Sequence, residues 1–173
     1  MNVLELFKPI TTFVFDVDGV LTDGTVLVLD NGLQARRMHI KDGFALQMAI
    51  KNGYRVKIIS GGTSPQVMDR LDKLGVKDVN MTVLDKKGFL ENFMAQNSLE
   101  KNQVLYMGDD LPDIPAMSVV GLPCCPADAA VEVKEAASYI SSLNGGFACV
   151  RDVIEKVLKL NGHWHYRDDV ASR

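Results

Sequence analysis

The stretch FVFDVDGVLTDG, residues 13–24, begins as an apolar run typical of a buried strand and ends among three carboxylates, Asp16, Asp18 and Asp23. Carboxylates that lie together at the mouth of a core strand repel one another and lose solvation. Such an arrangement needs a compensating cation or a chemical task, although Asp23 could simply close the turn after the strand. The segment therefore directs the search for a functional site to the end of this strand.

The length and composition of the chain indicate one ordinary domain. A chain of 173 residues fits a single hydrophobic core. Its residues are 47% hydrophobic and 24% charged, with a net charge of −3, so no nucleic-acid partner is indicated. The N-terminal stretch MNVLELFKPITTFVFDV is interrupted by charged residues and a proline, which leaves no run long enough for a signal peptide or a membrane span. We therefore expect a cytoplasmic protein that binds neither membrane nor nucleic acid.

The three cysteines, Cys124, Cys125 and Cys149, lack the C-x-x-C spacing of many zinc sites. Their odd number also argues against a disulfide framework. We expect buried, reduced thiols at these positions.

Short apolar runs rich in β-branched residues alternate with segments of helical periodicity. This alternation predicts an α/β fold: a doubly wound, mostly parallel, Rossmann-like sheet with helices on both faces. The predicted strands are residues 12–17, 55–60 and 103–108, with weaker ones at 79–83 and 138–141. The predicted helices are residues 42–52, 86–97, 126–137 and 147–160, and one that runs from the N-cap Ser64 to a stop at Gly75. We expect one domain over residues 1–160 and a loosely ordered C-terminal tail over residues 161–173.

The segment TVLVLDNGLQARRMHI, residues 25–40, departs from this rhythm. It contains two extended runs joined by Asp-Asn-Gly, and Asn-Gly between extended runs predicts a β-hairpin. The first arm carries Val26 and Val28 on one face and Leu27 and Leu29 on the other. A hairpin that projects into water would not be apolar on both faces, so we expect a contact with another part of the chain or with another subunit.

Polar side chains follow the three strongest strands at their carboxyl ends, where open parallel sheets bind ligands. They are Asp16 and Asp18, then Ser60, then Asp109 and Asp110. We expect Asp16 and Asp18 to point the same way, because alternate residues of an extended chain share a face. Four carboxylates at one edge form an oxygen-only cluster that suits a hard cation, and Mg²⁺ fits best.

A cation beside a hydroxyl and an ammonium suits a transferring phosphoryl group, which needs charge neutralisation and an in-line nucleophile. Ser60 offers the hydroxyl, and Lys86 in VLDKKG offers the ammonium. No Walker-type GxxxxGK[ST] loop occurs, which removes the usual nucleotide-binding interpretation. An ionised Asp can attack phosphorus and form an aspartyl-phosphate, while a second acid protonates the leaving alkoxide and later takes a proton from water.

Four motifs occur in order along the chain: DVDGVLTDG at 16–24, IISGG at 58–62, Lys86, and GDDLPD at 108–113. The series resembles the four motifs of the haloacid dehalogenase superfamily of phosphatases. The segment NGGFACVRDV, residues 144–153, is similar to the C-terminal GGxGAVRE motif of the subfamily that hydrolyses 3-deoxy-D-manno-octulosonate 8-phosphate. That subfamily also has the GVLTDG start and the hairpin. The resemblance spans residues 12–152.

The resemblance implies a Mg²⁺-dependent phosphomonoester hydrolase that acts on 3-deoxy-D-manno-octulosonate 8-phosphate through an aspartyl-phosphate. The gaps between the motifs are filled by the hairpin, helices and a strand, so we expect no cap domain. The resemblance also implies a homo-oligomer, a tetramer, whose neighbouring subunit covers the open site. The implied roles are nucleophile for Asp16, acid/base for Asp18, metal ligand for Asp16, Asp109 and the main-chain oxygen of Asp18, phosphate ligand for Ser60, Gly61 and Lys86, support for Asp110 and Asp113, and substrate contact for Arg70 and Lys73.

Other functions remain open at this point. A non-enzymatic receiver domain shares the acidic pocket, the hydroxyl, the lysine and the parallel sheet, but it accepts phosphate on an Asp that ends its third strand. Here the D-x-D follows the first strand. A non-catalytic partner of a sugar-acid enzyme is disfavoured because every chemical residue is present. Gly62 stands where related phosphatases carry Arg or Glu, so a nonulosonate 9-phosphate, of the sialic-acid or deaminoneuraminate type, is the alternative substrate.

Several of these residues also have a simpler interpretation. Asp110 and Asp113 could cap the helix that follows them. Arg70 and Lys73 could belong to a solvated helix face. The stretch GHWHY, residues 162–166, resembles a metal-binding tag only weakly, and we expect it to dock on a subunit surface.

Overall fold

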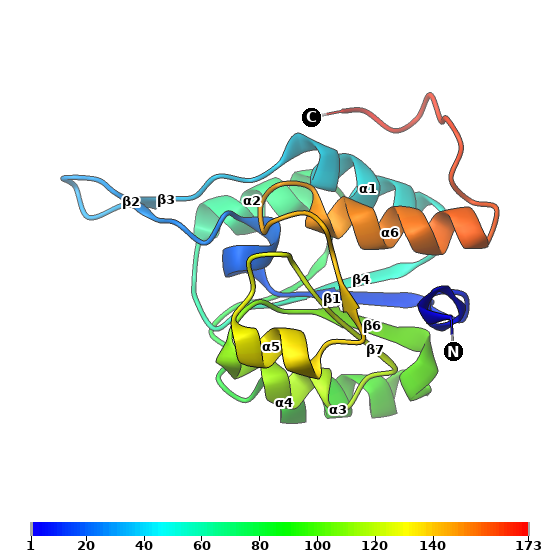
Figure 1. Cartoon of the computed structure of the whole chain (residues 1–173). Coiled ribbons are helices and arrows are strands. Elements are labelled where there is room, and N and C mark those ends of the chain that lie inside the picture. The colour runs from blue at the N-terminus through cyan, green and yellow to red at the C-terminus, as the bar shows by residue number, and fades with distance from the viewer. Residues whose placement is uncertain (1, 173) are drawn as a thin grey trace.

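The predicted strands form one sheet that is parallel throughout. The computed structural model describes residues 2–172, and the strand order of its main sheet is β5-β4-β1-β6-β7-β8. The chain starts at β1 in the middle, winds outward through β4 and β5, and then winds outward on the other side (Figure 1). This confirms the doubly wound α/β fold. The strands are β1 (Thr12–Phe15), β4 (Arg55–Ile59), β5 (Asp78–Asn80), β6 (Val104–Met107), β7 (Leu122–Cys125) and β8 (Tyr139–Ile140).

Helices cover both faces of the sheet and create two cores (Figure 1). One face carries α1 (Ile40–Lys51), α2 (Pro65–Lys73) and α6 (Cys149–Leu160); the other carries α3 (Lys86–Gln96), α4 (Ile114–Met117) and α5 (Val131–Ala136). Alternation along β1 serves both cores, because Phe13 and Phe15 pack into the first and Val14 into the second. In residues 2–172, no helix is both long enough and apolar enough to cross a membrane.

The strand β7 is not predicted by the sequence pattern. It contains Pro123, and proline in an interior strand cannot donate to the ladder, which weakens the strand signal. The strand β7 nevertheless lies between β6 and β8. Pro123 still contributes to the ladder through its carbonyl, which accepts the N–H of Ser138 at 2.9 Å.

The helix predicted over residues 126–137 is shorter in the structure, where α5 begins at Val131. The preceding residues form a turn, and their N–H groups donate to neighbouring loops instead of to a helix. The N–H of Ala130 donates to the carbonyl of Asp109 at 2.9 Å. The turn therefore braces the loop that follows β6.

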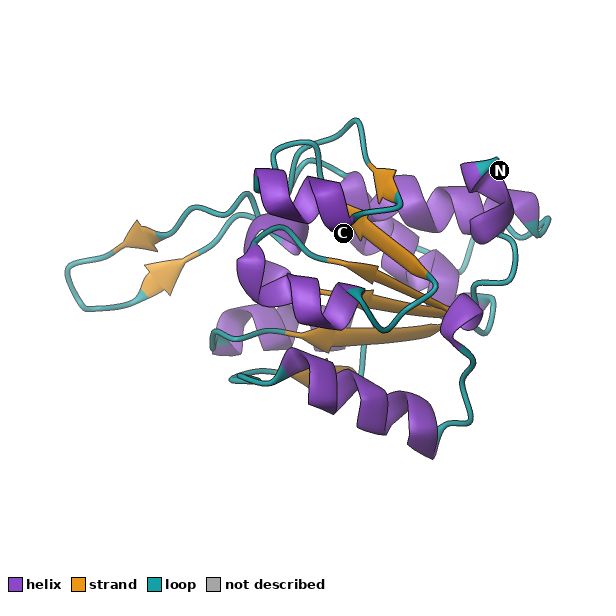
Figure 2. Ribbon diagram, turned by 60° about the horizontal axis from the view of Figure 1, so that its bottom comes forward, coloured by secondary structure: helices purple, strands orange, loops and turns teal. Residues whose placement is uncertain are grey.

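The predicted hairpin projects from the body of the protein (Figures 1 and 2). Its arms, β2 (Leu27–Val28) and β3 (Gln34–Ala35), pair antiparallel. Asn31 shapes the turn, because its side-chain oxygen accepts the N–H of Leu33 at 3.1 Å. The apolar side chains of the first arm are exposed on both faces of the hairpin, namely Val26, Leu27, Val28 and Leu29. No other part of the same chain covers them within the described residues.

The C-terminal tail lies against α1 of its own chain. Trp164 meets Phe44 edge to face, with ring centroids 6.0 Å apart, and Val170 is buried. The hydroxyl of Tyr54 and Nδ1 of His163 are 2.8 Å apart. The stretch GHWHY therefore has an intramolecular docking surface, at the end of the protein remote from the hairpin (Figure 1).

The segment after β8 packs against the loop after β1 and supports it. The N–H of Gly146 donates to the carbonyl of Val20 at 2.9 Å. A Cβ at Gly145 would overlap the carbonyl oxygen of Gly19, so only glycine allows this backbone contact. Ala148, two residues after Gly146, adopts a left-handed conformation, with φ of 75°, where the similar motif quoted above has glycine. Ala148 is therefore a strained position.

We predict that Ala148→Gly raises the free energy of unfolding by about 1 kcal/mol, because glycine adopts positive φ without steric strain. Urea denaturation measures this change. Ala95→Gly is the matched control, since Ala95 lies exposed in α3, and there the same substitution should lower stability by up to about 1 kcal/mol. Equal destabilisation by the two variants would show that Ala148 stores no strain.

Candidate active site

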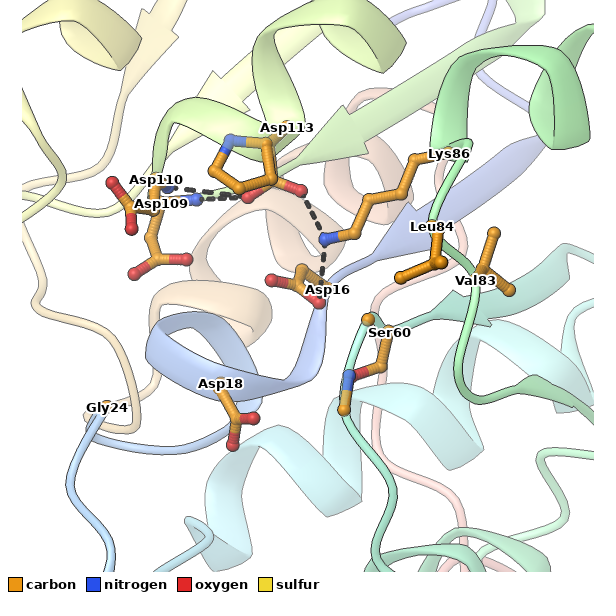
Figure 3. A pocket seen from close by; sticks show the side chains of 13 residues that line it. Asp16, Asp18, Gly24, Ser60, Val83, Leu84, Lys86, Asp109, Asp110 and Asp113 are labelled. Atoms are coloured by element: carbon orange, nitrogen blue, oxygen red, sulfur yellow. Dashed lines mark hydrogen bonds and ion pairs between the residues drawn. The ribbon is translucent and has the colours of Figure 1, made fainter.

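The loops that follow β1, β4, β5 and β6 enclose a cavity of about 430 Å³ at the carboxyl edge of the sheet (Figure 3). The chain leaves the neighbouring strands β1 and β6 in opposite directions, which makes this edge the switch point where doubly wound sheets bind ligands. We call this cavity the acidic pocket. Its lining includes Asp16, Asp18, Ser60, Gly61, Gly62, Lys86, Asp109, Asp110 and Asp113. All the predicted catalytic, metal and phosphate residues are therefore in one place.

Asp16 lies directly after β1 and is almost buried. Its N–H continues the ladder by donating to the carbonyl of Met107 at 3.1 Å, which fixes the backbone at the pocket floor. Its Oδ1 lies 3.2 Å from Nζ of Lys86. Burial and the nearby Asp113 carboxylate raise the pKa of Asp16 to about 7, against the opposing effect of Lys86. Burial and the Asp113 carboxylate therefore outweigh the single ammonium of Lys86 in their effect on Asp16.

Asp113 is fully engaged by donors from three parts of the fold. Its Oδ1 accepts from Nζ of Lys86 at 2.7 Å and from the hydroxyl of Tyr106 at 2.6 Å. Its Oδ2 accepts the N–H groups of Asp109 at 3.0 Å and Asp110 at 3.4 Å. Asp113 thus anchors Lys86 and shapes the GDD loop, and it makes no side-chain cap to α4. Both acids cap the short 3-10 turn Leu111–Asp113: Asp110 is its N-cap, with Oδ1 accepting the N–H of Leu111 at 2.9 Å, and Asp113 completes the capping box by accepting the N–H of Asp110.

Asp16, Asp109 and Asp113 each offer a carboxylate oxygen within 4.8 Å of the other two. Burial, Asp113 and Asp16 raise the pKa of Asp109 to about 7. Because the oxygens of Asp113 are already bonded to donors, Asp16 and Asp109 are the two that can turn to a cation. Oxygen donors, burial and mutual repulsion together fit a hard divalent ion such as Mg²⁺.

Gly19, the glycine of the D-x-D-G motif, allows Asp109 to approach the loop after β1. A Cβ at Gly19 would overlap the Asp109 carboxylate, and its φ of +80° also favours glycine. The glycine therefore lets the acids of β1 and β6 share one small space.

Asp18 departs from the expectation that it points the same way as Asp16. The chain is not extended after Asp16 but turns over Val17–Leu21, where the N–H of Thr22 donates to the carbonyl of Val17 at 3.0 Å. The Asp18 carboxylate consequently points away from the cluster of Asp16, Asp109 and Asp113 (Figure 3). Its Oδ1 lies 2.6 Å from Nε of Arg36, at the base of the hairpin. The expectation of a shared direction is therefore wrong.

Ser60 is buried at the end of β4, and its N–H donates to the carbonyl of Asn80 at 2.9 Å. Its Oγ accepts the N–H of Gly62 at 3.2 Å, so the SGG turn folds back on the hydroxyl. Figure 3 shows Ser60 on the far side of Asp16 from Asp113. Ser60, Gly61 and Lys86 thus line the same pocket as Asp16.

The two predicted substrate contacts lie outside the acidic pocket. Arg70 lines a second cavity of about 400 Å³ between the base of the hairpin and α2; we call it the hairpin cavity, lined by Gln34, Ala35, Arg36, Met38, Ile40, Ser64, Gln66, Val67 and Arg70. Lys73 is exposed and pairs with Asp69 of the same helix at 2.6 Å. The structure therefore brings Arg70, and not Lys73, to a cavity near the site.

Two residues of the site escaped sequence reasoning. Tyr106 lies inside a strand, where an aromatic residue is expected for packing alone, and only its contact with Asp113 reveals its role. Arg36 stands beside Arg37 in the second hairpin arm, and no pattern separates the two. The available signal was its place in the chain: a basic residue at the base of the hairpin can reach the D-x-D loop, because the hairpin begins and ends beside that loop.

Comparison with known proteins supports the geometry. The family of haloacid dehalogenase-like hydrolases matches residues 77–154. The chain is 33% identical to the 3-deoxy-D-manno-octulosonate 8-phosphate phosphatase KdsC of Haemophilus influenzae, over 92% of this chain and 87% of the relative. It is 30% identical to KdsC of Escherichia coli K12, over 93% and 86% respectively.

Solved structures agree with these relatives. The 3-deoxy-D-manno-octulosonate 8-phosphate phosphatase of Yersinia pestis superposes with a TM-score of 0.91 at 28% identity, covering 99% of this chain and 91% of that one. The phosphatase of Moraxella catarrhalis, solved with magnesium, phosphate and a KDO molecule, superposes with a TM-score of 0.88 at 30% identity, covering 91% of both chains.

These matches exclude the receiver alternative, and the strand order agrees, because receivers have the flavodoxin-like order with the first strand next to the third. The segments between the motifs form the hairpin, α1 and β4, and then α2 and β5, so no cap domain interrupts residues 2–172. The chain belongs to the haloacid dehalogenase-like hydrolases and, within them, to the KdsC family of phosphatases.

Proposed function

We propose that this protein is a Mg²⁺-dependent phosphatase that removes phosphate from 3-deoxy-D-manno-octulosonate 8-phosphate. The observation that carries the proposal is the position of Asp16, a buried carboxylate 3.2 Å from Lys86 and within ligand distance of Asp109. The names of its relatives and the Mg²⁺ and KDO in the Moraxella catarrhalis structure support the choice of metal and substrate.

The proposed chemistry has two steps. A carboxylate oxygen of Asp16 forms a bond to phosphorus while the bond from phosphorus to the sugar oxygen breaks, and Asp18 gives its proton to that oxygen. Asp18 then takes a proton from a water molecule whose oxygen forms a bond to phosphorus while the bond from phosphorus to Asp16 breaks, which releases phosphate and restores the Asp16 carboxylate. Asp16, Asp109 and the main-chain oxygen of Asp18 would hold Mg²⁺, which would neutralise the charge of the phosphoryl group.

The phosphoryl group is proposed to rest on Ser60 Oγ, the backbone of Gly61 and Nζ of Lys86. Lys86 suits this role because Asp113 holds its ammonium 2.7 Å away and burial limits its motion. A fixed cation stabilises the developing charge without having to reorganise during the reaction.

The sugar end of the substrate is less constrained by the pocket. Arg70 and Lys73 remain the proposed contacts for the sugar acid, with Arg70 favoured by its place in the hairpin cavity. A nonulosonate 9-phosphate is the second candidate substrate, because Gly62 leaves the pocket mouth without an Arg or Glu side chain.

The protein is also proposed to be cytoplasmic. The cysteines support this location, because Cys124, Cys125 and Cys149 are unpaired and buried.

The hairpin is proposed to build a homo-oligomer, a tetramer, that covers the open site. Its first arm exposes Val26, Leu27, Val28 and Leu29. Full burial of each such side chain stabilises by roughly 1.5–3 kcal/mol, so four per subunit contribute at most roughly 6–12 kcal/mol, which is of the same order as the cost of association.

We expect the purified protein to hydrolyse 3-deoxy-D-manno-octulosonate 8-phosphate with a higher kcat/KM than a deaminoneuraminate 9-phosphate. Phosphate release measured on both compounds decides between the two substrates. A higher kcat/KM on the nine-carbon compound would favour the alternative substrate instead.

Chelation should abolish turnover and Mg²⁺ should restore it, whereas Ca²⁺, which prefers more ligands, should compete with Mg²⁺ without supporting activity.

Asp16→Asn should lower kcat by at least about 10³-fold, because the amide cannot form the covalent intermediate. Asp72→Asn is the control, since Asp72 pairs with Lys77 on the surface and should retain full activity. Steady-state rates in Mg²⁺ measure both variants. An Asp16→Asn enzyme that kept a tenth of the wild-type rate would rule out the nucleophile assignment.

Val28→Asp should produce smaller particles by light scattering, because it places a charge in the proposed interface. Val131→Asp is a matched control: Val131 is 67% exposed and Val28 is 69% exposed, but Val131 begins α5 away from the hairpin. The loss of kcat/KM in Val28→Asp should be larger for the sugar-acid phosphate than for a small aryl phosphate. A monomeric wild-type protein would refute the interface.

A further inference from the structure

Asp18 is held by a residue of the hairpin. Nε of Arg36 lies 2.6 Å from Oδ1 of Asp18. The Arg36 side chain is only 9% exposed, although it stands next to the exposed β3, whereas the Asp18 side chain is 41% exposed. A largely buried guanidinium therefore forms an ion pair with a half-exposed carboxylate.

The surroundings of Asp18 explain why it needs such a partner. The carboxyl groups of Asp16 and Asp109 lie on the pocket side, and the nearby ammonium of Lys86 is already paired with Asp16 and Asp113. On another side Gly62 offers no side chain; a Cβ there would lie 3.2 Å from Oδ2 of Asp18. Without Arg36, the exposure of Asp18 and the lack of a side chain at Gly62 would leave this carboxylate free to rotate toward solvent.

We propose that Arg36 is a positioning residue that holds the acid/base Asp18 at the mouth of the acidic pocket; this rests on the phosphatase chemistry proposed above. In this assignment Arg36 contacts the side chain of Asp18, and it touches neither the phosphoryl group nor the two carboxylates that hold the metal, Asp16 and Asp109. It acts by restricting Asp18 to the side of the pocket from which the leaving group departs. A displacement of about 1 Å in such a group can cost 10²-fold in rate.

The position of Arg36 ties the acid/base to the hairpin. Arg36 also lines the hairpin cavity, while its partner Asp18 lines the acidic pocket, so the ion pair joins a wall of one cavity to a wall of the other. The hairpin arm therefore sets the position of the guanidinium, and through it the position of Asp18.

Leaving-group dependence tests this role without the sugar substrate. We expect Arg36→Ala to lower kcat/KM for phenyl phosphate by about 10- to 100-fold, because its leaving oxygen needs a proton. The loss for 4-nitrophenyl phosphate, whose leaving group is stable without one, should be only a few-fold. Comparison of kcat/KM isolates the steps up to loss of the leaving group. Equal losses on both phosphates would overturn the proposal.

Matched variants separate positioning from stability. Arg37→Ala is the control, because Arg37 is 77% exposed and lies 3.9 Å from Asp23; it should keep wild-type kinetics. Arg36→Lys should recover part of the phenyl phosphate rate, because a lysine can still pair with Asp18. If Arg36→Ala does not fold, Arg36→Gln keeps most of the stem without the charge and should show the same selective loss. Thermal melts establish that each variant is folded.

A double-mutant cycle identifies the residue through which Arg36 acts. In an Asp18→Asn background, Arg36→Ala should cause no further loss of kcat/KM for phenyl phosphate. Additive losses would show that Arg36 acts elsewhere and would overturn the proposal. A wild-type protein without activity on any phosphomonoester would refute the proposed function as well. An active wild-type enzyme in which Arg36→Ala matches Arg37→Ala would refute only the role of Arg36.

Discussion

The buried contact between Asp113 and Lys86 is the interaction on which the rest of the acidic pocket depends. The Asp113 carboxylate gathers the ammonium of α3, the Tyr106 hydroxyl of β6 and two backbone N–H groups of the GDD loop. Three elements are thereby fixed to one point, and Lys86 remains beside Asp16 before any substrate arrives. Loss of one partner from such a buried pair would leave the other charge unpaired, at a cost of about 3–5 kcal/mol. The geometry of the pocket and the stability of the fold are linked through this contact.

Asp16 and Asp109 lie where the fold destabilises their charged forms. Burial and repulsion from Asp113 raise the pKa values of Asp16 and Asp109 to about 7, which means that the fold holds both carboxylates in a place that disfavours their charge. The parallel sheet makes this possible, because its ladder fixes the backbone on either side of the switch point. A divalent cation held by these carboxylates would stabilise their charged forms. The two carboxyls whose charge is disfavoured thus lie at the edge where ligands bind, whereas the buried hydroxyl of Tyr106 beside them is satisfied by Asp113.

Much of the fold and of the pocket could be predicted because parallel strands send every carboxyl end to the same edge. Asp16, Ser60 and Asp109 could be grouped from their places after strands, without knowledge of side-chain contacts. The direction of Asp18 could not, because it depends on how the backbone turns after Asp16 and on the distant Arg36, and neither follows from the alternation of an extended chain. Arg36 looks like its neighbour Arg37 in the sequence, and only the return of the hairpin to the D-x-D loop distinguishes them. Strand β7 was missed because Pro123 weakens its pattern.

Gly62 and Arg36 both lie against Asp18, which affects how substitutions at these two positions can be combined. Its backbone does not require glycine by its φ, yet any Cβ there would come within 3.2 Å of Asp18. A larger residue at this position must therefore shift a carboxylate that Arg36 already holds on its other side. Positions 36 and 62 lie 26 residues apart in the chain but share one side chain between them. In the divergence of this family, substitutions at one position should be tolerated or rejected according to the residue at the other, so the two should evolve as an epistatic pair.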